Sequence, residues 1–335
     1  MSRVFTVAEI AQAHDGSLGI AHSFIDALKD SGVDAVKFQV HIAEAESSAY
    51  EQFRVNFSYE DKTRYDYWKR MEFTAEQWQG LKDHCEQSGM EFIASPFSNA
   101  AVDLLEKLNV FRYKIGSGET SNLLMLEKIA ETGKPVILST GMSSWNELDE
   151  AADLLRHKNC RFSVLQCTTA YPTSPEQWGL NVIKELKERY NVPVGFSDHS
   201  GEVYACLAAA ALGAEILEFH VTFNKEMFGP DATSSLTIEQ VKMLIRGVRQ
   251  IEATLKSPVK KADTAKFDAL KKMFEKTLVV NRDVKAGEKI TTDILEAKKP
   301  RGHGVSASDY RSLIGKTFRH NLEKWSFIKP GDINE

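Results

Sequence analysis

The chain has 335 residues, 42% of them hydrophobic, and its formal net charge of -5 comes without any block of basic residues. This composition predicts a globular protein with one large domain and a small one, and it argues against the basic surface of a nucleic-acid-binding protein. No stretch approaches the roughly 18 consecutive apolar residues of a membrane span. We therefore expect a small-molecule partner.

Two further features predict a cytoplasmic location. Met1–Glu9 runs directly into a strand-like pattern without a charged and apolar leader. The four cysteines include no Cys-x-x-Cys pair, and most of them lie in or near apolar runs typical of buried thiols in a reducing compartment.

Short apolar or β-branched runs alternate with helical patterns from the start of the chain to about residue 255. The eight predicted strands are Arg3–Glu9, Asp34–Gln39, Met90–Ser95, Val110–Ile115, Pro135–Ser139, Arg161–Cys167, Pro193–Ser197 and Glu215–His220. The helical patterns that follow them are Ile20–Ser31, Ala75–Ser88, Asn99–Leu108, Leu123–Glu131, Trp145–His157, Pro175–Glu188, Glu202–Leu212 and Ile238–Thr254. Eight such units predict an α/β fold of the (β/α)8 TIM-barrel type. An open doubly wound sheet is the alternative, but the Gly-x-Gly-x-x-Gly fingerprint is missing after the first strand.

Two segments depart from the alternation. The loop after the second strand runs from about His41 to Phe73, and its aromatic content predicts that it folds over a site or makes an interface. After the eighth helix, the lysine-rich stretch Lys256–Lys266 breaks the pattern. We predict a catalytic barrel over residues 1–255, a linker over 256–276 and a compact small domain over 277–335.

Nearly every predicted strand ends in a group that can hold an anion, a metal or a proton, and in a barrel all these ends converge at one face. Lys114 lies among apolar residues on the fourth strand, where an ammonium group is costly unless it faces a site or an anion. With hydroxyl and backbone N–H groups it would form a phosphate cradle. The serines of this cradle are Ser95, Ser117, Ser139 and Ser197. Taken singly, each serine is more often a turn residue.

His199 and His220 fall on neighbouring strands, which suits two imidazole ligands of a divalent metal with positions left for substrate. A lone histidine is more often structural, so the prediction depends on the pair. Glu9 and Glu218 could ligate the metal through water, orient an imidazole or exchange protons with substrate. Lys37, inside an apolar run on the second strand, is expected to face the same site.

Several strings resemble the N-acetylneuraminate (sialic acid) synthase family, and together they cover almost the whole chain. They are Ala8–Glu9–Ile10 before His14–Asp15–Gly16–Ser17, Lys37–Phe38–Gln39, Tyr113–Lys114–Ile115–Gly116–Ser117–Gly118–Glu119, Leu138–Ser139–Thr140–Gly141–Met142, Cys167–Thr168–Thr169–Ala170–Tyr171–Pro172 and Gly195–Phe196–Ser197–Asp198–His199. Residues after about Thr277 resemble the family's C-terminal antifreeze-like (SAF) domain of the β-clip type.

The resemblance implies a metal, usually Mn²⁺ with Mg²⁺ or Co²⁺ as possibilities, on His199 and His220. It implies that phosphoenolpyruvate is held by Lys114, the four serines and Thr169. Tyr171 and Asp231 are expected to bind the sugar. Family members are domain-swapped homodimers in which the antifreeze-like domain supplies an arginine to the acyl group of the sugar. Here the chain reads Lys298–Lys299–Pro300–Arg301, so either Arg301 or Lys299 takes that place or the contact is lost.

The implied enzyme is a transferase that condenses phosphoenolpyruvate with N-acetylmannosamine and water to give N-acetylneuraminate and phosphate. Glu9, Lys37, Lys114 and Glu218 are the expected catalytic residues. One alternative keeps the chemistry but uses a diacetamido-trideoxyhexose, as legionaminate and pseudaminate synthases do. A metal-dependent aldolase or sugar isomerase on the same barrel is a more distant alternative and would release no phosphate. A non-enzymatic ice- or carbohydrate-binding protein would leave the lysines and histidines unexplained.

Overall fold

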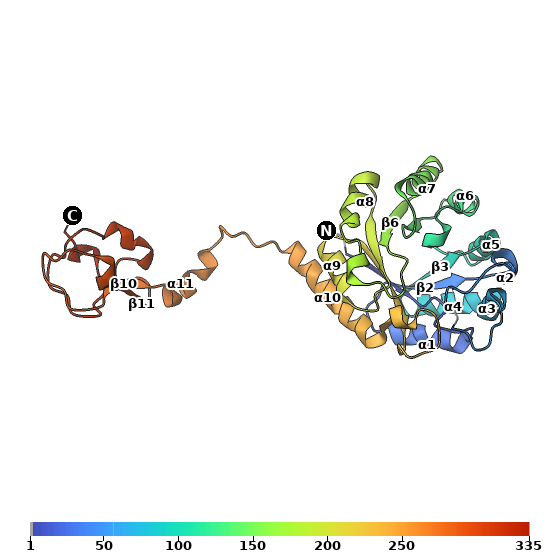
Figure 1. The fold of residues 1–335 in the computed structure, drawn as a ribbon, viewed down its shortest axis with the longest axis horizontal. Coiled ribbons are helices and arrows are strands. Elements are labelled where there is room, and N and C mark those ends of the chain that lie inside the picture. The colour runs from blue at the N-terminus through green and yellow to red at the C-terminus, as the bar shows by residue number, and fades with distance from the viewer. Residues whose placement is uncertain (1–2, 56, 335) are drawn as a thin grey trace. The chain divides into compact units, whose positions relative to one another are not determined.

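The computed structural model describes residues 3–55 and 57–334, and it divides into two compact units, Met1–Ser257 and Pro258–Glu335. The first unit contains eight parallel strands, and β8 returns to pair with β1, which closes the sheet into a barrel (Figure 1). The strands are β1 (Phe5–Glu9), β2 (Ala35–Val40), β3 (Glu91–Pro96), β4 (Tyr113–Ile115), β5 (Val136–Ser139), β6 (Phe162–Cys167), β7 (Val194–Asp198) and β8 (Ile216–Thr222). The predicted TIM barrel is confirmed.

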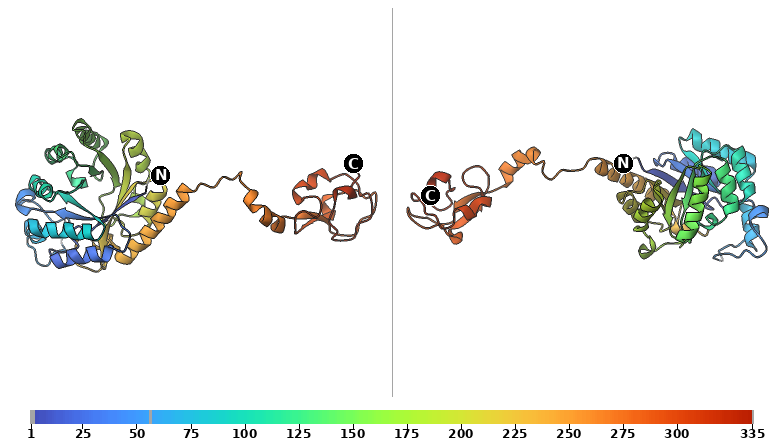
Figure 2. Two further views of the ribbon diagram at one scale, coloured as in Figure 1. Left: turned by 180° about the vertical axis from the view of Figure 1, so that it is seen from behind. Right: turned by 90° about the horizontal axis from the view of Figure 1, so that it is seen from above.

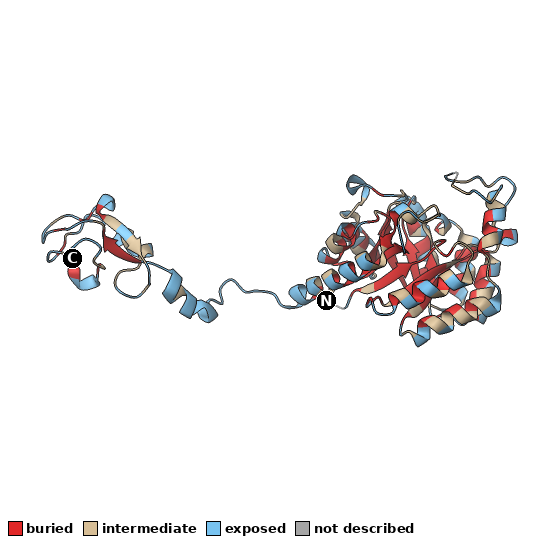
Figure 3. Ribbon diagram, turned by 90° about the horizontal axis from the view of Figure 1, so that it is seen from below, coloured by how far each residue is buried: buried red, intermediate tan, exposed pale blue. Residues whose placement is uncertain are grey.

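A helix follows each barrel strand, and the helices surround the strands from outside (Figures 1 and 2). They are α1 (Leu18–Leu28), α4 (Ala75–Gln87), α5 (Asn99–Lys107), α6 (Leu123–Glu131), α7 (Trp145–His157), α8 (Val182–Tyr190), α9 (Tyr204–Ala211) and α10 (Ile238–Lys256). Capping boxes at Thr74, Ser144 and Thr237 fix the starts of α4, α7 and α10. Buried residues are concentrated in the strands and on the inner helix faces (Figure 3).

Two expectations about local structure need correction. The segment from His41 to Phe73 is more than a loop, because it contains α2 (Ala43–Glu46) and α3 (Arg64–Met71) around a small apolar cluster of its own. The helix expected from Pro175 begins only at Val182. Residues Pro175–Gln177 form a 3-10 turn, and Gly179, at a φ of +63°, interrupts the helical backbone.

The barrel interior is layered, because side chains two residues apart on a strand point to the same face. An apolar layer fills the interior: Val7, Ala35, Ile93, Ile137, Leu165 and Ile216. Two residues further along each of these strands stands a polar side chain or a thiol: Glu9, Lys37, Ser95, Ser139, Cys167 and Glu218. The parallel register aligns these layers, so that Glu9 is opposite Lys37 and Ser197 is opposite Glu218. A single polar layer therefore lies at the carboxyl ends of the barrel strands.

The remaining strands and helices are short. In the first unit, β9 (Leu236–Thr237) pairs with the end of β8. In the second unit, α11 (Asp268–Phe274) precedes an antiparallel pair of β10 (Thr277–Val280) and β11 (Leu295–Lys298), and a separate apolar core forms around them. Within the described residues, no helix combines the length and apolarity needed to cross a membrane.

Candidate active site

A cavity of about 420 Å³ opens at the carboxyl ends of the barrel strands. The site residues predicted for the barrel all line it: Glu9, Lys37, Ser95, Lys114, Ser117, Ser139, Thr169, Tyr171, Ser197, His199, Glu218, His220 and Asp231. Arg301 belongs to the second unit, where its guanidinium group pairs with Glu275 at 2.6 Å and with Asp268 at 3.2 Å. Lys299 lies in the same unit, with its Nζ 5.0 Å from the ring centroid of Phe274.

Two lysines and two glutamates form a buried charge cluster on the floor of the cavity. Lys37 Nζ lies 2.6 Å from Glu9 Oε2, and Lys114 Nζ lies 3.2 Å from Glu218 Oε1. Lys37 Nζ is also 4.0 Å from Glu218 Oε1. The register of β1 and β2 places Glu9 opposite Lys37, and Glu218 of β8 lies in the same polar layer. Lys114 reaches Glu218 from β4.

Attraction between the lysines and the glutamates stabilises the charged forms of Glu218 and Lys37. Burial by itself would raise the pKa of Glu218, but Lys114 and Lys37 outweigh burial and lower this pKa to about 2. Burial would also lower the pKa of Lys37, but Glu218 and Glu9 outweigh that effect and raise it. Both groups are therefore charged near neutral pH. The formal charges of the two lysines and two glutamates cancel, so a bound anion would need further positive charge nearby.

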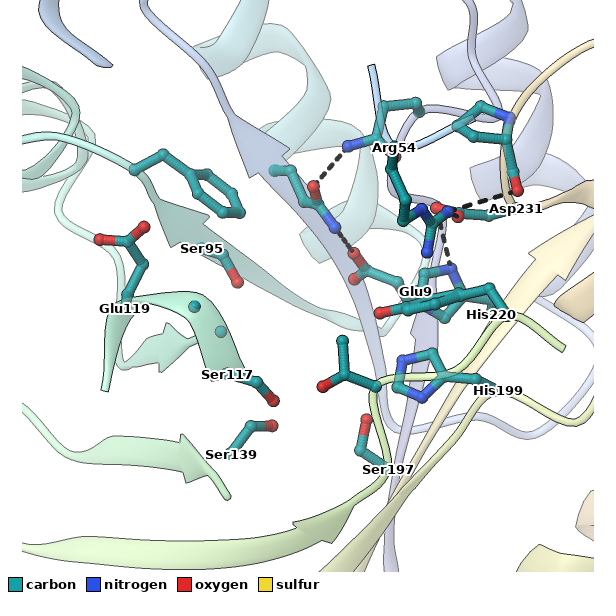
Figure 4. Close-up of a pocket in the computed structure, with 18 of the residues that line it drawn as sticks. Glu9, Arg54, Ser95, Ser117, Glu119, Ser139, Ser197, His199, His220 and Asp231 are labelled. Carbon is teal, nitrogen blue, oxygen red and sulfur yellow. Dashed lines mark hydrogen bonds and ion pairs between the residues drawn. The ribbon is translucent and has the colours of Figure 1, made fainter. Parts of the chain in front are cut away.

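Hydroxyl groups surround the two ammonium groups. Lys114 Nζ donates to Ser139 Oγ at 2.8 Å, and Lys37 Nζ donates to Ser95 Oγ at 3.2 Å. Ser117, Ser139 and Ser197 approach the cavity from three different strand ends (Figure 4). A cation surrounded by several neutral hydrogen-bond donors is a typical phosphate-binding arrangement in proteins.

Gly141 leaves space for this cradle, which gives a testable prediction. A Cβ atom at this position would lie 2.5 Å from Thr169 Oγ1 and 2.7 Å from Ser117 Oγ. The Gly141→Ala change is therefore expected to displace both hydroxyls. It should raise the KM for phosphoenolpyruvate, the phosphate ester that the family resemblance implies, by roughly tenfold to a hundredfold. Initial-rate kinetics would measure it. Gly80→Ala on α4 is the matched control, because a Cβ there meets nothing within 4 Å, and an unchanged KM in Gly141→Ala would contradict the cradle.

The two predicted metal ligands lie together at one side of the cavity. The ring centroids of His199 and His220 are 5.0 Å apart, and the ring of Tyr171 lies 4.3 Å from that of His199. Burial, reinforced by His220, lowers the pKa of His199 well below its usual value, so this ring is neutral as a metal ligand must be. Asp198 fixes the turn that presents His199 by accepting hydrogen bonds from the backbone N–H and hydroxyl of Ser200.

These residues fit a divalent cation. Two imidazoles are suitable ligands, and Glu218 Oε2 is buried without a hydrogen-bond partner among the described residues. An unpartnered buried carboxylate oxygen in such a site is an unsatisfied acceptor for a water or an ion. Within the described residues no group of three or more His, Cys, Asp or Glu side chains is arranged to hold a metal, so the protein would contribute these two histidines.

The outer side of the cavity combines Tyr171 and Asp231 with Arg54, which comes from the segment between α2 and α3. Arg54 Nη2 donates to Asp231 Oδ1 at 2.8 Å, and its guanidinium carbon lies 4.1 Å from the centroid of the Tyr171 ring. Asp231 Oδ2 is also 3.8 Å from His220 Nδ1. Figure 4 shows Arg54 and Asp231 together above the two histidines.

Several residues that line the cavity have no predicted role in the site: Gln12, Gln39, His41, Arg54, Glu119 and Cys167. The two-residue alternation could have found Gln39, which follows Lys37 on the same face of β2, and Cys167, which follows Leu165 on β6. No periodic signal exists for Arg54 or His41, because both lie outside regular strands and helices.

Comparisons with known proteins agree with this geometry. Residues 24–260 match the NeuB family and residues 275–334 match the SAF domain. The chain is 32% identical to N,N'-diacetyllegionaminic acid synthase of Campylobacter jejuni, covering 98% of this chain and 100% of that protein. It is 34% identical to N-acetylneuraminate-9-phosphate synthase of Homo sapiens, covering 96% and 90%. The crystal structure of N-acetylneuraminic acid (sialic acid) synthetase from Leptospira borgpetersenii, in complex with citrate, superposes with a TM-score of 0.70 at 30% identity, covering 80% and 90%.

Proposed function

Because the chain belongs to the NeuB family, we propose that it condenses phosphoenolpyruvate with the open-chain aldehyde of N-acetylmannosamine and water, giving N-acetylneuraminate and phosphate. The observation that carries this proposal is the buried Lys37–Glu9 and Lys114–Glu218 cluster beside the His199–His220 pair. An enol phosphate and an aldehyde bound side by side need an anion cradle next to an electrophilic site. The lysines and serines of the cavity support the cradle, and the two histidines support the electrophilic site because they would hold a metal.

In the proposed complex, Lys114 and the hydroxyls of Ser117, Ser139 and Ser197 hold the phosphate, with Thr169 at its edge. In the same proposal, Lys37 and Ser95 hold the carboxylate end. Bound phosphoenolpyruvate would add negative charge to the cavity and would displace the Lys–Glu contacts. A divalent cation on the two histidines would offset that charge. We propose Mn²⁺ on His199 and His220, with Mg²⁺ or Co²⁺ as alternatives; when bound, it would polarise the aldehyde oxygen.

The chemistry then requires one new C–C bond and one broken C–O bond. C3 of the enol phosphate forms a bond to the aldehyde carbon, and positive charge develops at C2. Water adds at C2, and the C2–O bond to phosphate breaks as the water oxygen becomes the C2 ketone oxygen. Of the two protons of this water, one ends on the former aldehyde oxygen, which becomes a hydroxyl, and the other leaves with the inorganic phosphate. In this proposal Glu9 takes one proton of that water. Its two oxygens contact Lys37 and Gln39, which supports the proposal by fixing the orientation of the carboxylate. Lys37 and Lys114 stabilise the negative charge of the reacting anions.

A second acceptor is a diacetamido-trideoxyhexose, and the relative from Campylobacter jejuni favours it. The human relative, a 9-phosphate synthase by name, makes a phosphorylated hexose the third acceptor to test. Arg54, Tyr171 and Asp231 form the acceptor side of the cavity in this chain. The homodimer, the cytoplasmic location and a sugar contact of Arg301 or Lys299 remain predictions.

The proposal is tested by phosphate release from phosphoenolpyruvate with Mn²⁺. N-acetylmannosamine, its 6-phosphate and a diacetamido-trideoxyhexose are supplied in separate reactions, and the product is identified by mass spectrometry. We expect stoichiometric phosphate and a nonulosonic acid with N-acetylmannosamine. Turnover with another acceptor alone would replace the sugar assignment. Pyruvate formation from the nonulosonic acid, without phosphate release in any mixture, would replace the synthase by an aldolase.

A further inference from the structure

His41 is a buried histidine beside the proposed proton-transfer group, and its ring is held in one plane. It follows the last residue of β2 and is 4% exposed. Its ring stacks on Trp68 of α3, with centroids 3.8 Å apart, and on Phe97 after β3, at 4.5 Å. The two interplanar angles are 16° and 18°. The sandwich leaves the imidazole only its edges for polar contacts.

Both nitrogen atoms of His41 have polar partners. Nδ1 lies 2.7 Å from Glu46 Oε1, so Nδ1 carries the proton that this carboxylate accepts. The other oxygen of Glu46 accepts the backbone N–H of Ile42, which fixes the carboxylate. On the opposite edge, His41 Nε2 lies 3.3 Å from Gln12 Nε2 and 3.2 Å from Gln39 Oε1. Glu46 therefore selects the tautomer, and Nε2 faces two amides.

These contacts continue to Glu9. Gln12 Nε2 donates to Gln39 Oε1, and Gln39 Nε2 donates to Glu9 Oε1 at 2.8 Å. The other oxygen of Glu9 is the one that pairs with Lys37. An unbroken chain of contacts thus runs from Glu46 through His41, the two amides and Glu9 to the lysine.

This series of contacts allows only one orientation of the Gln39 amide. With neutral His41, one N–H of Gln12 donates to Nε2 and the other to the Gln39 carbonyl oxygen. With protonated His41, Nε2–H donates to that oxygen directly. In both states the carbonyl of Gln39 faces donors and its NH2 faces Glu9. A flipped amide would place a carbonyl oxygen against the Glu9 carboxylate and NH2 against NH2, leaving buried groups unsatisfied.

We propose that His41 is a positioning residue that acts on the reaction through Gln39 and Glu9. By fixing the Gln39 amide, it keeps the Glu9 carboxylate in the orientation from which it exchanges protons with the reacting centre. This inference rests on the proposed function, since it assigns the orientation of that reaction's proton-transfer group. It also explains why the segment from His41 to Phe73 has its own apolar cluster, because Trp68 in that cluster forms one wall of the sandwich.

His41→Phe is the first test, because phenylalanine keeps a ring between Trp68 and Phe97 but removes both nitrogens. We expect kcat to fall by roughly tenfold to a hundredfold, as for other small misplacements of catalytic groups, with the KM for phosphoenolpyruvate changed less than about twofold. His84→Phe is the matched control, since His84 pairs with His22 and Asp26 on the outer helices. An unchanged kcat in His41→Phe, with the wild type active, would overturn the inference and leave the proposed function intact.

A double-variant cycle and a chemical rescue separate positioning from a general loss of structure. In the Glu9→Gln background, His41→Phe should lower kcat no further, because both changes remove the same effect. Additive losses would show that His41 does not act through Glu9. In His41→Gly, imidazole should fill the space between Trp68 and Phe97 and restore activity, whereas pyrrole, which has no acceptor nitrogen, should not.

Crystal structures give a readout that does not depend on turnover. In wild-type crystals Gln39 should donate to Glu9, and in His41→Phe the Glu9 carboxylate should rotate away from this contact. A retained Gln39–Glu9 hydrogen bond in the variant would overturn the inference, whether or not the wild type is active. Inactivity of the wild type with every acceptor would instead refute the proposed function.

Discussion

Alanine in place of His199 is expected to reduce Mn²⁺-dependent phosphate release by roughly a thousandfold or more, since metal polarisation of a carbonyl is worth several kcal/mol. His199 is buried at the end of β7 and shares its side of the cavity with His220. Its loss would leave one imidazole, which is too few ligands to retain a divalent ion. Phosphate-release kinetics and the metal content of the purified protein would measure the two effects separately.

Chelation should reproduce this loss in the wild type, and added Mn²⁺ should restore activity there but not in His199→Ala. His157→Ala is the matched control, because His157 lies in α7 on the outside of the barrel and its Nδ1 contacts only the backbone oxygen of Asp153 among the hydrogen bonds described. Full activity in the chelated wild type would refute the metal proposal while leaving the phosphoenolpyruvate cradle untested by this measurement.

Replacement of Lys114 by methionine should both destabilise the protein and abolish productive binding of phosphoenolpyruvate. The ammonium group of Lys114 is the nearest cation to Glu218, and Lys37 is 4.0 Å from the same oxygen. Breaking a buried ion pair by removing one partner typically costs about 3–5 kcal/mol, because it leaves an uncompensated charge. We expect kcat/KM for phosphoenolpyruvate to fall by at least roughly a hundredfold, measured by initial rates, and the unfolding midpoint in urea to fall as well.

The double variant Lys114→Met/Glu218→Gln separates the two effects. It removes the orphaned charge, so most of the lost stability should return, while activity should stay low because the phosphate has still lost its cation. Lys128→Met provides the surface control, since the pair of half-buried Lys128 with exposed Asp103 is expected to contribute no more than about 1 kcal/mol. Recovery of activity in the double variant would mean that Lys114 serves only to neutralise Glu218.

Much of the barrel and of its polar layer could be predicted from the sequence, because both depend on short-range periodicity. Alternation with a period of two places Glu9 above Val7 and Lys37 above Ala35 on the inner face of each strand. Eight strand–helix units then close in one way, with all carboxyl ends at one face. The serines and histidines at the strand ends follow from the same rule.

The errors and omissions lie where the chain has no period. The predicted helix of the sixth strand–helix unit starts too early, at Pro175, because a Pro-initiated 3-10 turn and Gly179 precede α8, which begins at Val182. The aromatic segment after β2 carried no pattern that would reveal α2 and α3, since each has only one or two turns. Their stability comes from a tertiary cluster, which outweighs local propensity.

The sequence by itself determined the barrel, the small C-terminal unit and the residue types that reach the cavity, because helix and strand periods and the motifs are local. Only the tertiary structure decided which charges pair and which rings stack. Arg54 contacts Asp231 across 177 residues, and the ring of His41 lies between Trp68 of α3 and Phe97 after β3. Ion pairs, amide orientations and stacking depend on distances of a few ångströms between distant parts of the chain, and no local pattern encodes those distances.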